Sequence, residues 1–322
     1  MKRAMVLMNM GGPNNLNEVD VFLKNMFNDK YIIGAPQPIR SLIGYIIRKK
    51  RLKEATNNYK MLGGVSPIVG NTKRLIRRLK RKTKDGVFYV MRYTPPFSKD
   101  IIQELKNYDE IYAIPMYPHY SSTTTKSSIE DLLKEGKKYG LETKIKTIDN
   151  YHKRVEYNNV IVKKIKEKIK ENENSKDFTL IFSAHGLPQR TIDKGDPYQK
   201  QIEENVEEVK KLLKEQNIEF NSIELAYQSR LGPMEWIKPY LEDKLEEIKE
   251  KNDKVIIYPI AFTIDNSETN GELGIEYREV AEELGIKDYR VCEVVNYDED
   301  FQNFILQLYK EIIENSNKIN KN

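Results

Sequence analysis

Four carboxylic residues in the segment from 255 to 277, VIIYPIAFTIDNSETNGELGIEY, are spaced so that they could support proton or metal chemistry. They are Asp265, Glu268, Glu272 and Glu276. Their separations of three, four and four residues place them on one face of a helix. Ionising all four together is unfavourable unless a cation or a shared proton relieves the repulsion. A solvated acidic face is the plainer interpretation, but this row follows an apolar run that suits a buried parallel strand, at the edge where α/β sheets place their sites.

Histidine is rare in this chain, and one of the three histidines stands at the end of an apolar run. His185 lies in IFSAHGLP, just after an expected strand over 179–183, so its imidazole should reach the carboxyl edge of the same sheet. A lone histidine is more often a packed or surface residue than a catalyst. A histidine opposite Glu268, however, could bind a metal ion and transfer protons. We therefore expect His185 and Glu268 to act as a pair.

Length and composition exclude several classes of protein. The 322 residues favour two domains over one, and no apolar run approaches the roughly 20 residues that a bilayer-spanning helix needs. Cys292 is the only cysteine, which excludes an internal disulfide and a cysteine-ligated zinc or iron–sulfur cluster. We therefore expect a cytoplasmic protein with no permanently bound cofactor.

Positive charge is concentrated in one part of the chain. Between Arg40 and Lys84 there are fifteen Lys or Arg residues and one acid, Glu54. Such an excess could attract anionic lipid or a carboxylate-bearing ligand, although a solvated basic surface is the plainer interpretation. Nucleic acid is not an expected partner, because no nucleic-acid-binding motif accompanies the charge.

Strands and helices alternate along the chain in two similar sets. Strands are expected at 4–9, 87–92, 111–116, 143–147, 179–183, 223–228, 255–260 and 289–292. Helical patterns lie between them, as at 16–27, 99–106, 157–171, 198–216 and 236–251. MGGP after the first strand resembles HGLP after the fifth, which predicts two similar βαβ halves of an α/β chain. MGGP lacks the G-x-G-x-x-G spacing, so a nucleotide site is not expected.

The first half carries an insertion around residues 31–67. Pro13 and Pro115 are 102 residues apart, whereas the matching Pro188 and Pro259 are 71 apart. Within the insertion, apolar residues at 39, 42, 43, 46 and 47 follow the spacing of an amphipathic helix that ends in the basic run 48–51. Such a helix could cover the core, cap an apolar ligand or rest on an anionic membrane. We expect it to form a lip over a cleft between the two halves.

Seven segments taken together resemble the ferrochelatase family, in its bacterial protoporphyrin form. In order they are LMNMGGP, YKMLGGVSP, VMRYTPP, MYPHYSSTTTKSS, FSAHGLPQRTIDKGDPY, YQSRLGPMEWIKP and PIAFTIDNSETNGELGIEY. The resemblance implies two Rossmann-like, chelatase-type domains, each a four-stranded parallel sheet flanked by helices, without a nucleotide site. The first would span 1–150, include the lip at 31–67 and receive a C-terminal helix over about 300–316. The second, 151–299, would carry His185 and the acidic helix.

The resemblance also implies the reaction and the roles of particular residues. Porphyrin and Fe²⁺ would be substrates and haem the product, with His185 and Glu268 serving in pyrrole deprotonation and metal delivery. Asp265, Glu272 and Glu276 would form a proton or metal path on a π-type helix. Met10 would lie beneath the ring, where a tyrosine would indicate a coproporphyrin user. The full set of matching substrate-binding residues is Met10, Arg51, Tyr59, Ser66, Arg92, Tyr93, Ser121 and Trp236.

Two positions depart from the family pattern. Asn266 stands where the family commonly has histidine, and Asn270-Gly271 stands where Leu-Tyr is usual. Because asparagine does not titrate near neutral pH, a proton role at this position is lost or moves to Asp265. The Asn-Gly pair should loosen the helix locally. We interpret both as variation within an active enzyme, since His185, Glu268 and Glu272 are kept.

Other functions fit parts of the sequence. A related chelatase acting on coproporphyrin or sirohydrochlorin would share the fold, although the lip and QSRLGPMEW argue against sirohydrochlorin. A non-catalytic porphyrin or haem carrier would not need Glu268 and Glu272 at the ring, because buried unpaired carboxylates are costly. A hydrolase built on Ser183 or Ser121 lacks the G-x-S-x-G motif. We expect a monomeric enzyme that makes peripheral membrane contact through the lip helix.

Overall fold

The fold is described by a computed structural model, which defines residues 1–230, 232 and 234–319. Leu231 and Pro233, which belong to the QSRLGPMEW motif, lie outside the described residues. The chain divides into two compact units. Unit 1 comprises Met1–Tyr117, Ser121–Asn150 and the C-terminal segment from Gln302, and unit 2 comprises Pro118–Tyr120 and Tyr151–Phe301.

Unit 1 contains a parallel sheet with the strand order β2-β1-β3-β4. Its strands are β1 (Arg3–Asn9), β2 (Gly86–Met91), β3 (Glu110–Pro115) and β4 (Ile145–Thr147). Nearly all of β1 and β3 is buried, as expected for central strands that are covered by helices on both faces.

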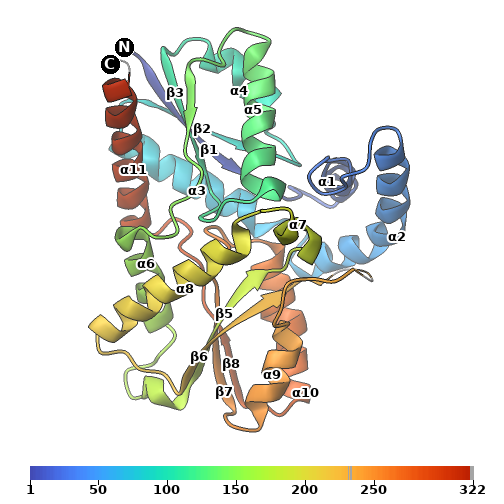
Figure 1. Cartoon of the computed structure of the whole chain (residues 1–322), viewed down its shortest axis with the longest axis vertical. Helices are drawn as coiled ribbons and strands as arrows, with labels where there is room; N and C mark the ends of the chain where they lie inside the picture. Colours follow the sequence, from blue (N-terminus) through green and yellow to red (C-terminus); the bar gives the residue numbers. More distant parts are fainter. Residues whose placement is uncertain (231, 233, 320–322) are drawn as a thin grey trace. The chain divides into compact units, whose positions relative to one another are not determined.

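Unit 2 contains a second parallel sheet, β6-β5-β7-β8, in which the chain order of the strands repeats that of unit 1. Its strands are β5 (Thr179–His185), β6 (Ser222–Gln228), β7 (Lys254–Pro259) and β8 (Asp288–Val291). Helices flank each of the two sheets in Figure 1. The eight strands lie where the apolar runs predicted them, so the predicted fold class is confirmed.

Helices of unit 1 cover its sheet through apolar side chains. Leu105 of α4 and Leu132 of α5 belong to the same buried cluster as Val6 and Met8 of β1. Leu75 and Leu79 of α3 are also buried, whereas the opposite side of α3 is cationic. The helices are α1 (Glu18–Phe27), α2 (Ile39–Met61), α3 (Pro67–Lys82), α4 (Ser98–Leu105), the π-helix η1 (Ser122–Lys126), α5 (Ser127–Lys137) and α11 (Glu299–Ile319).

Helices of unit 2 cover the second sheet in a similar way. Leu245 of α9 and Ala281 of α10 pack with Ile181 and Ile257 of the central strands. The helices are α6 (Val155–Lys166), the single turn η2 (Ser175–Asp177), α7 (Gln189–Asp193), α8 (Tyr198–Glu215), α9 (Leu241–Lys249), the π-helix η3 (Glu268–Glu276) and α10 (Tyr277–Glu283).

The helix expected to start at Trp236 begins instead at Leu241. Trp236 lies in an extended segment and forms an isolated antiparallel bridge with Pro188. Pro239 explains the late start, because a proline disfavours the helical conformation of the residue before it.

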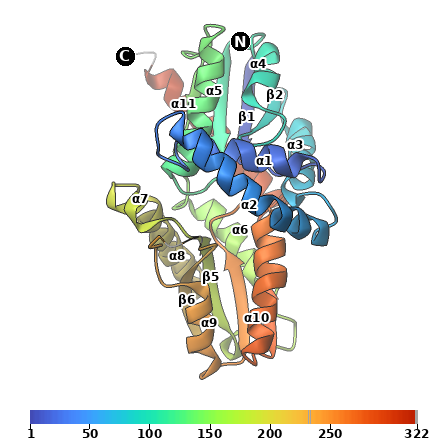
Figure 2. The ribbon, with the colours of Figure 1, turned by 90° about the vertical axis from the view of Figure 1, so that its right-hand side faces the viewer.

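The insertion of unit 1 is the long helix α2, which lies beside α1 in Figure 2. Its apolar residues form the stripe that the sequence spacing predicted, but other parts of the protein cover only part of that stripe. Ile47 packs against the cluster formed by α1, and Gly44 is buried there, whereas Ile39, Leu42 and Ile46 are exposed. The apolar stripe is therefore wider than one contact with α1 can cover. Among the described residues, no helix is both long enough and apolar enough to cross a bilayer.

Candidate active site

The carboxyl edge of the unit 2 sheet brings the chemically important residues together. His185 is the last residue of β5 and pairs in register with Gln228, the last residue of β6. The neighbouring β7 ends at Pro259, and the chain then leads to Glu268 at the start of η3. Because these strands are parallel, their carboxyl ends lie at one edge, where open α/β sheets bind ligands.

The side chains of His185 and Glu268 contact each other. His185 Nδ1 lies 2.8 Å from Glu268 Oε2. Exposed fractions of 35% and 22% leave both side chains open to a ligand. Burial disfavours the imidazolium, but the Glu268 carboxylate outweighs this effect, so the pKa of His185 is raised above its ordinary value. The Tyr198 hydroxyl donates a 2.9 Å hydrogen bond to the His185 carbonyl and so fixes the end of the strand.

Glu272 lies one turn further along η3 and belongs to the same hydrogen-bond network. Ser229 Oγ donates to Glu272 Oε2 at 2.6 Å, and Gln228 Nε2 donates to the same oxygen at 3.4 Å. Ser183 Oγ in turn donates to Gln228 Oε1 at 2.7 Å. Burial, with added repulsion from Glu268, raises the pKa of Glu272 to about 7. This carboxyl can therefore take up and release a proton near neutral pH.

The row of four carboxylic residues is divided in the structure. η3 is a π-helix that begins at Glu268, so Asp265 lies in the preceding loop and not on the helix. Asp265 is buried and accepts a 2.5 Å hydrogen bond from Asn296 Nδ2, and burial raises its pKa. Glu276 is exposed at the other end of η3. Glu268 and Glu272 are thus the two members of the row that share a hydrogen-bond network with His185.

Trp236 supports the loop that follows His185. It is buried, and its bridge to Pro188 holds it against the HGLP segment. A Cβ atom on Gly186 would lie 3.3 Å from Trp236 Cε3 and 2.8 Å from the Gln228 carbonyl oxygen. The close packing therefore requires glycine at position 186.

Among the candidate substrate-binding residues of unit 1, Arg92 and Tyr93 both contact the buried Asp29. Arg92 Nη2 lies 3.1 Å from Asp29 Oδ2, and the Tyr93 hydroxyl donates to the same oxygen at 3.1 Å. Arg92 Nε also donates to Ser127 Oγ at 2.8 Å. About a quarter of the Arg92 side chain remains exposed. Asp29 therefore orients a guanidinium that can still reach a ligand.

Three further candidates in unit 1 are buried and make structural contacts. Tyr59 packs edge-on against Phe22 of α1, with ring centroids 6.5 Å apart. The Ser66 N–H donates to the Pro13 carbonyl at 2.9 Å, and the Ser121 side chain accepts from the Thr123 N–H at the start of η1.

The two remaining candidates in unit 1, Met10 and Arg51, are partly exposed. The Met10 carbonyl accepts a 2.9 Å hydrogen bond from the Tyr93 N–H, and Arg51 Nη2 lies 3.8 Å from Glu54 Oε1 on α2.

Four residues of these networks were not identified from the sequence. Gln228, Ser229 and Tyr198 lie in the motifs YQSRLGPMEWIKP and FSAHGLPQRTIDKGDPY. The available signal was their position, since Gln228 ends β6, Ser229 follows it, and Tyr198 follows β5. Asp29 stands in the polar run NDK after an expected helix, which gave no comparable signal.

The site offers few side chains that could bind a metal ion. Within the part of the chain that the structure describes, no group of three or more His, Cys, Asp or Glu side chains is arranged to hold a metal ion. His185 and Glu268 offer one imidazole and one carboxylate, which are ligands that ferrous iron accepts. They could hold an ion that keeps most of its coordination positions for other ligands.

Comparisons with known proteins give consistent matches. The family model described as ferrochelatase matches residues 2–312. The ferrochelatase of Sulfurimonas denitrificans is 47% identical over 97% of this chain and 99% of its own length. That of Nitratiruptor sp. is 45% identical over 96% of this chain and 100% of its own length. Among solved structures, SirB from Bacillus subtilis with Fe³⁺ aligns with a TM-score of 0.60 at 10% identity, covering 99% of this chain and 98% of SirB, which shows a shared fold.

Proposed function

Because this chain belongs to the ferrochelatase family, we propose that it inserts Fe²⁺ into protoporphyrin IX to form protohaem, with His185 and Glu268 acting at the porphyrin centre. Family membership also confirms the resemblance that the seven motifs indicated, and it makes the chain an enzyme of the lyase class. The proposal for the two residues is supported by the 2.8 Å contact between His185 Nδ1 and Glu268 Oε2 at the carboxyl edge of the sheet.

Metal insertion requires the site to handle two protons and one divalent cation. The two pyrrole N–H groups lose their protons as Fe²⁺ enters, so charge balances and no electron is transferred. Fe²⁺ can bind the porphyrin nitrogens only when a nearby base accepts these protons. His185 and Glu268 can accept a proton or bind the incoming ion, since an imidazole and a carboxylate serve both purposes.

Glu272 is suited to carry protons away from this pair. Its pKa of about 7 lets it exist in both protonation states near neutral pH. Ser229 Oγ lies 2.6 Å from Glu272 Oε2 and 3.5 Å from Glu268 Oε2, so one hydroxyl connects the two carboxyls. We assign Glu272 to proton release, with exposed Glu276 next in line toward solvent.

The test is an anaerobic reaction of the purified protein with protoporphyrin IX and Fe²⁺, followed by porphyrin fluorescence and absorbance. We expect turnover well beyond one equivalent for the natural protein. In Glu268→Gln and His185→Ala, we expect turnover to fall at least about a hundredfold, because each variant removes a group that acts on the reacting atoms. Porphyrin binding should persist in both.

The Gln199→Ala variant serves as a control for general disturbance of the region, since Gln199 lies in the first turn of α8 and its amide donates to Glu203 on the same helix. Stoichiometric porphyrin binding without turnover in the natural protein would instead indicate a carrier. Near-normal turnover in either Glu268→Gln or His185→Ala would remove that residue from the reaction.

We also propose that α2 rests on a membrane surface. Ile39, Leu42 and Ile46 are between 46% and 62% exposed, and Lys49 and Lys50 follow them on the same helix. Apolar side chains next to cations favour the interface of an anionic bilayer. Sedimentation with vesicles containing phosphatidylserine should capture the natural protein and much less of the Leu42→Ser/Ile46→Ser variant. Equal capture of both proteins would show that this face of α2 does not bind the membrane.

A further inference from the structure

Asn266 makes an unusually complete set of hydrogen bonds just before the π-helix η3. Its Oδ1 accepts from the Glu268 N–H at 2.7 Å and from the Thr269 N–H at 3.4 Å. Its Nδ2 donates to the Ile264 carbonyl at 3.3 Å. The Asn266 side chain is buried, with 4% of the residue exposed. Both polar atoms of this side chain are therefore used to fix the local backbone.

These contacts have the form of a helix cap. The first N–H groups of a helix have no partner within the helix, and asparagine is among the residues that best supply one. Thr269 returns the interaction, because its Oγ1 accepts from the Asn266 N–H at 3.0 Å. This reciprocal pair resembles a capping box and defines where η3 starts.

The capped residue is the one that contacts His185. The N–H that Asn266 holds belongs to Glu268, and the carboxylate of Glu268 lies 2.8 Å from His185 Nδ1. The preceding Ser267 makes no side-chain capping bond, so the amide of Asn266 supplies this restraint. Without it, the first turn of η3 could fray and the Glu268 side chain could leave the imidazole.

We propose that Asn266 is a positioning residue, which holds the Glu268 carboxylate against His185 by capping η3. This inference rests on the proposed function of the His185–Glu268 pair. It gives Asn266 a role that needs no proton transfer by its own side chain, because an amide does not titrate near neutral pH.

The test compares two substitutions at position 266. Asn266→Ala removes the acceptor, whereas Asn266→Ser keeps a hydroxyl that can cap the same N–H groups without adding a charge beside Glu268. For Asn266→Ala we expect kcat to fall about tenfold, while the KM for protoporphyrin stays within about twofold, since the porphyrin contacts are unchanged. Asn266→Ser should recover kcat to within about threefold of the natural value.

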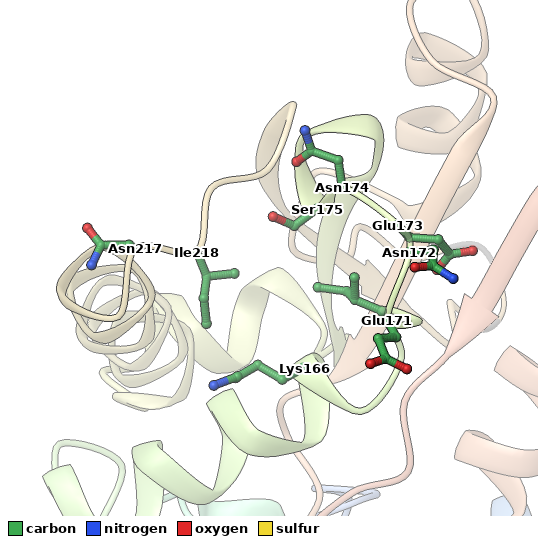
Figure 3. Close-up of a pocket in the computed structure, with 9 residues that line it drawn as sticks. Lys166, Glu171, Asn172, Glu173, Asn174, Ser175, Asn217 and Ile218 are labelled. Carbon is green, nitrogen blue, oxygen red and sulfur yellow. The ribbon is translucent and has the colours of Figure 1, made fainter.

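Asn174 provides a matched control in the same unit. Its Oδ1 accepts from the Lys176 N–H at 3.0 Å, which is the same contact between residues i and i+2. Asn174 lies before β5, at the amino end of the strand whose carboxyl end bears His185, and it lines a cavity of about 590 Å³ (Figure 3). Because Asn174 is exposed, Asn174→Ala should lower Tm by less than Asn266→Ala, and it should leave kcat unchanged.

A crystal structure of Asn266→Ala measures the positioning without any substrate. We expect the separation of His185 Nδ1 and Glu268 Oε2 to increase beyond about 3.5 Å, and to return to hydrogen-bond distance in Asn266→Ser. An unchanged separation in Asn266→Ala would overturn the inference even if the natural protein proves to be an active ferrochelatase. A lost contact in a protein that never turns over porphyrin would overturn the proposed function and leave the positioning role intact.

Discussion

Arg51 is the residue of α2 that we assign to a porphyrin propionate. A guanidinium can bind a carboxylate through two parallel hydrogen bonds, which a lysine cannot do. Its partner Glu54 is 3.8 Å away and largely exposed, so this ion pair would compete weakly with a ligand. We expect Arg51→Ala to raise the KM for protoporphyrin about tenfold with little change in kcat, and Arg51→Lys to recover only part of this loss.

Steady-state kinetics at fixed Fe²⁺ would measure the effect. Arg77→Ala is a suitable control, because Arg77 is an exposed cation on α3 of the same unit and changes the net charge equally. An equal KM increase in both variants would indicate general charge attraction, and no increase in Arg51→Ala would exclude Arg51 from propionate binding.

Glu272 should control how the reaction rate depends on pH. With a pKa of about 7, its carboxylate form, which accepts protons, increases as pH rises through 7. Turnover of the natural protein should rise over the same interval. Glu272→Gln preserves an oxygen that can accept from Ser229 but cannot accept a proton. We expect its kcat to fall about tenfold or more and to lose the rise near pH 7, as a pH–rate profile from 5.5 to 8.5 would show.

Glu272→Gln, which should lower kcat, should at the same time raise the stability of the fold. The folded-state pKa of Glu272 lies above its unfolded value, so the unfolded chain releases this proton first. The fold is therefore destabilised as pH rises from about 4.5 to about 7. Glu272→Gln should therefore stabilise unit 2 at pH 8 by roughly 1 to 2 kcal/mol and by less at pH 5. Denaturant titrations at both pH values would detect this difference. A variant that is destabilised at pH 8 would contradict the assigned origin of the pKa shift.

At the scale of secondary-structure elements, the packing of α2 on α1 depends on Gly44. A Cβ atom at this position would lie 2.6 Å from the Phe27 carbonyl oxygen, which is backbone and cannot rotate away. Gly44→Ala should therefore push α2 away from α1, even though alanine favours the helical conformation. We expect a loss of about 1 to 3 kcal/mol in stability and a higher KM for porphyrin, since Arg51 and Tyr59 lie on the displaced helix.

Gly70→Ala would be the matched control, because a Cβ on Gly70 of α3 meets nothing within 4 Å. Urea unfolding and porphyrin titration of both variants would test the contact. A Gly44→Ala protein as stable as the Gly70→Ala protein would show that α2 adjusts without cost.

The strands were predictable from the residue pattern, whereas the π-helix was implied only by the family resemblance. Each central strand is a continuous apolar run buried on both faces, so its position could be read directly. The spacing of Asp265, Glu268 and Glu272 fits an ordinary helix equally well, and the turn at Asn266 that excludes Asp265 depends on hydrogen bonds between side chains and backbone. Short-range polar contacts of this kind have no periodic pattern.

Part of the candidate site followed from the strand positions, and part did not. His185 was identified because it stands at the carboxyl end of an apolar run. Ser229 was missed because its backbone has φ +68°, a conformation that usually indicates glycine and that serine rarely adopts. In this conformation of the loop after β6, its hydroxyl donates to Glu272.

For the whole molecule, the two units share a strand topology but differ in chemistry. The central strand β1 is followed by Met10, and the equivalent strand β5 ends in His185. Unit 1 instead presents guanidinium groups, those of Arg51 and Arg92. Candidate groups for proton transfer thus belong to one unit, and candidate groups for binding propionates belong to the other. The shared topology supplies an equivalent sheet edge in each unit, and the residues placed there determine its use.

Acid sensitivity of the fold should arise in unit 2 from His119. This imidazole is buried 3.0 Å from Asn205 Oδ1 and 5.6 Å, between ring centroids, from His152. Burial lowers its pKa to about 3, so the unfolded chain binds a proton first, and stability should be lost as pH falls from about 6.5 toward 3. Between pH 7 and 5 this loss should be about 2 kcal/mol. His119→Gln keeps a donor to Asn205 and should remove this part of the pH dependence of stability in urea titrations. If the pH dependence were unchanged in the variant, groups other than His119 would be its source.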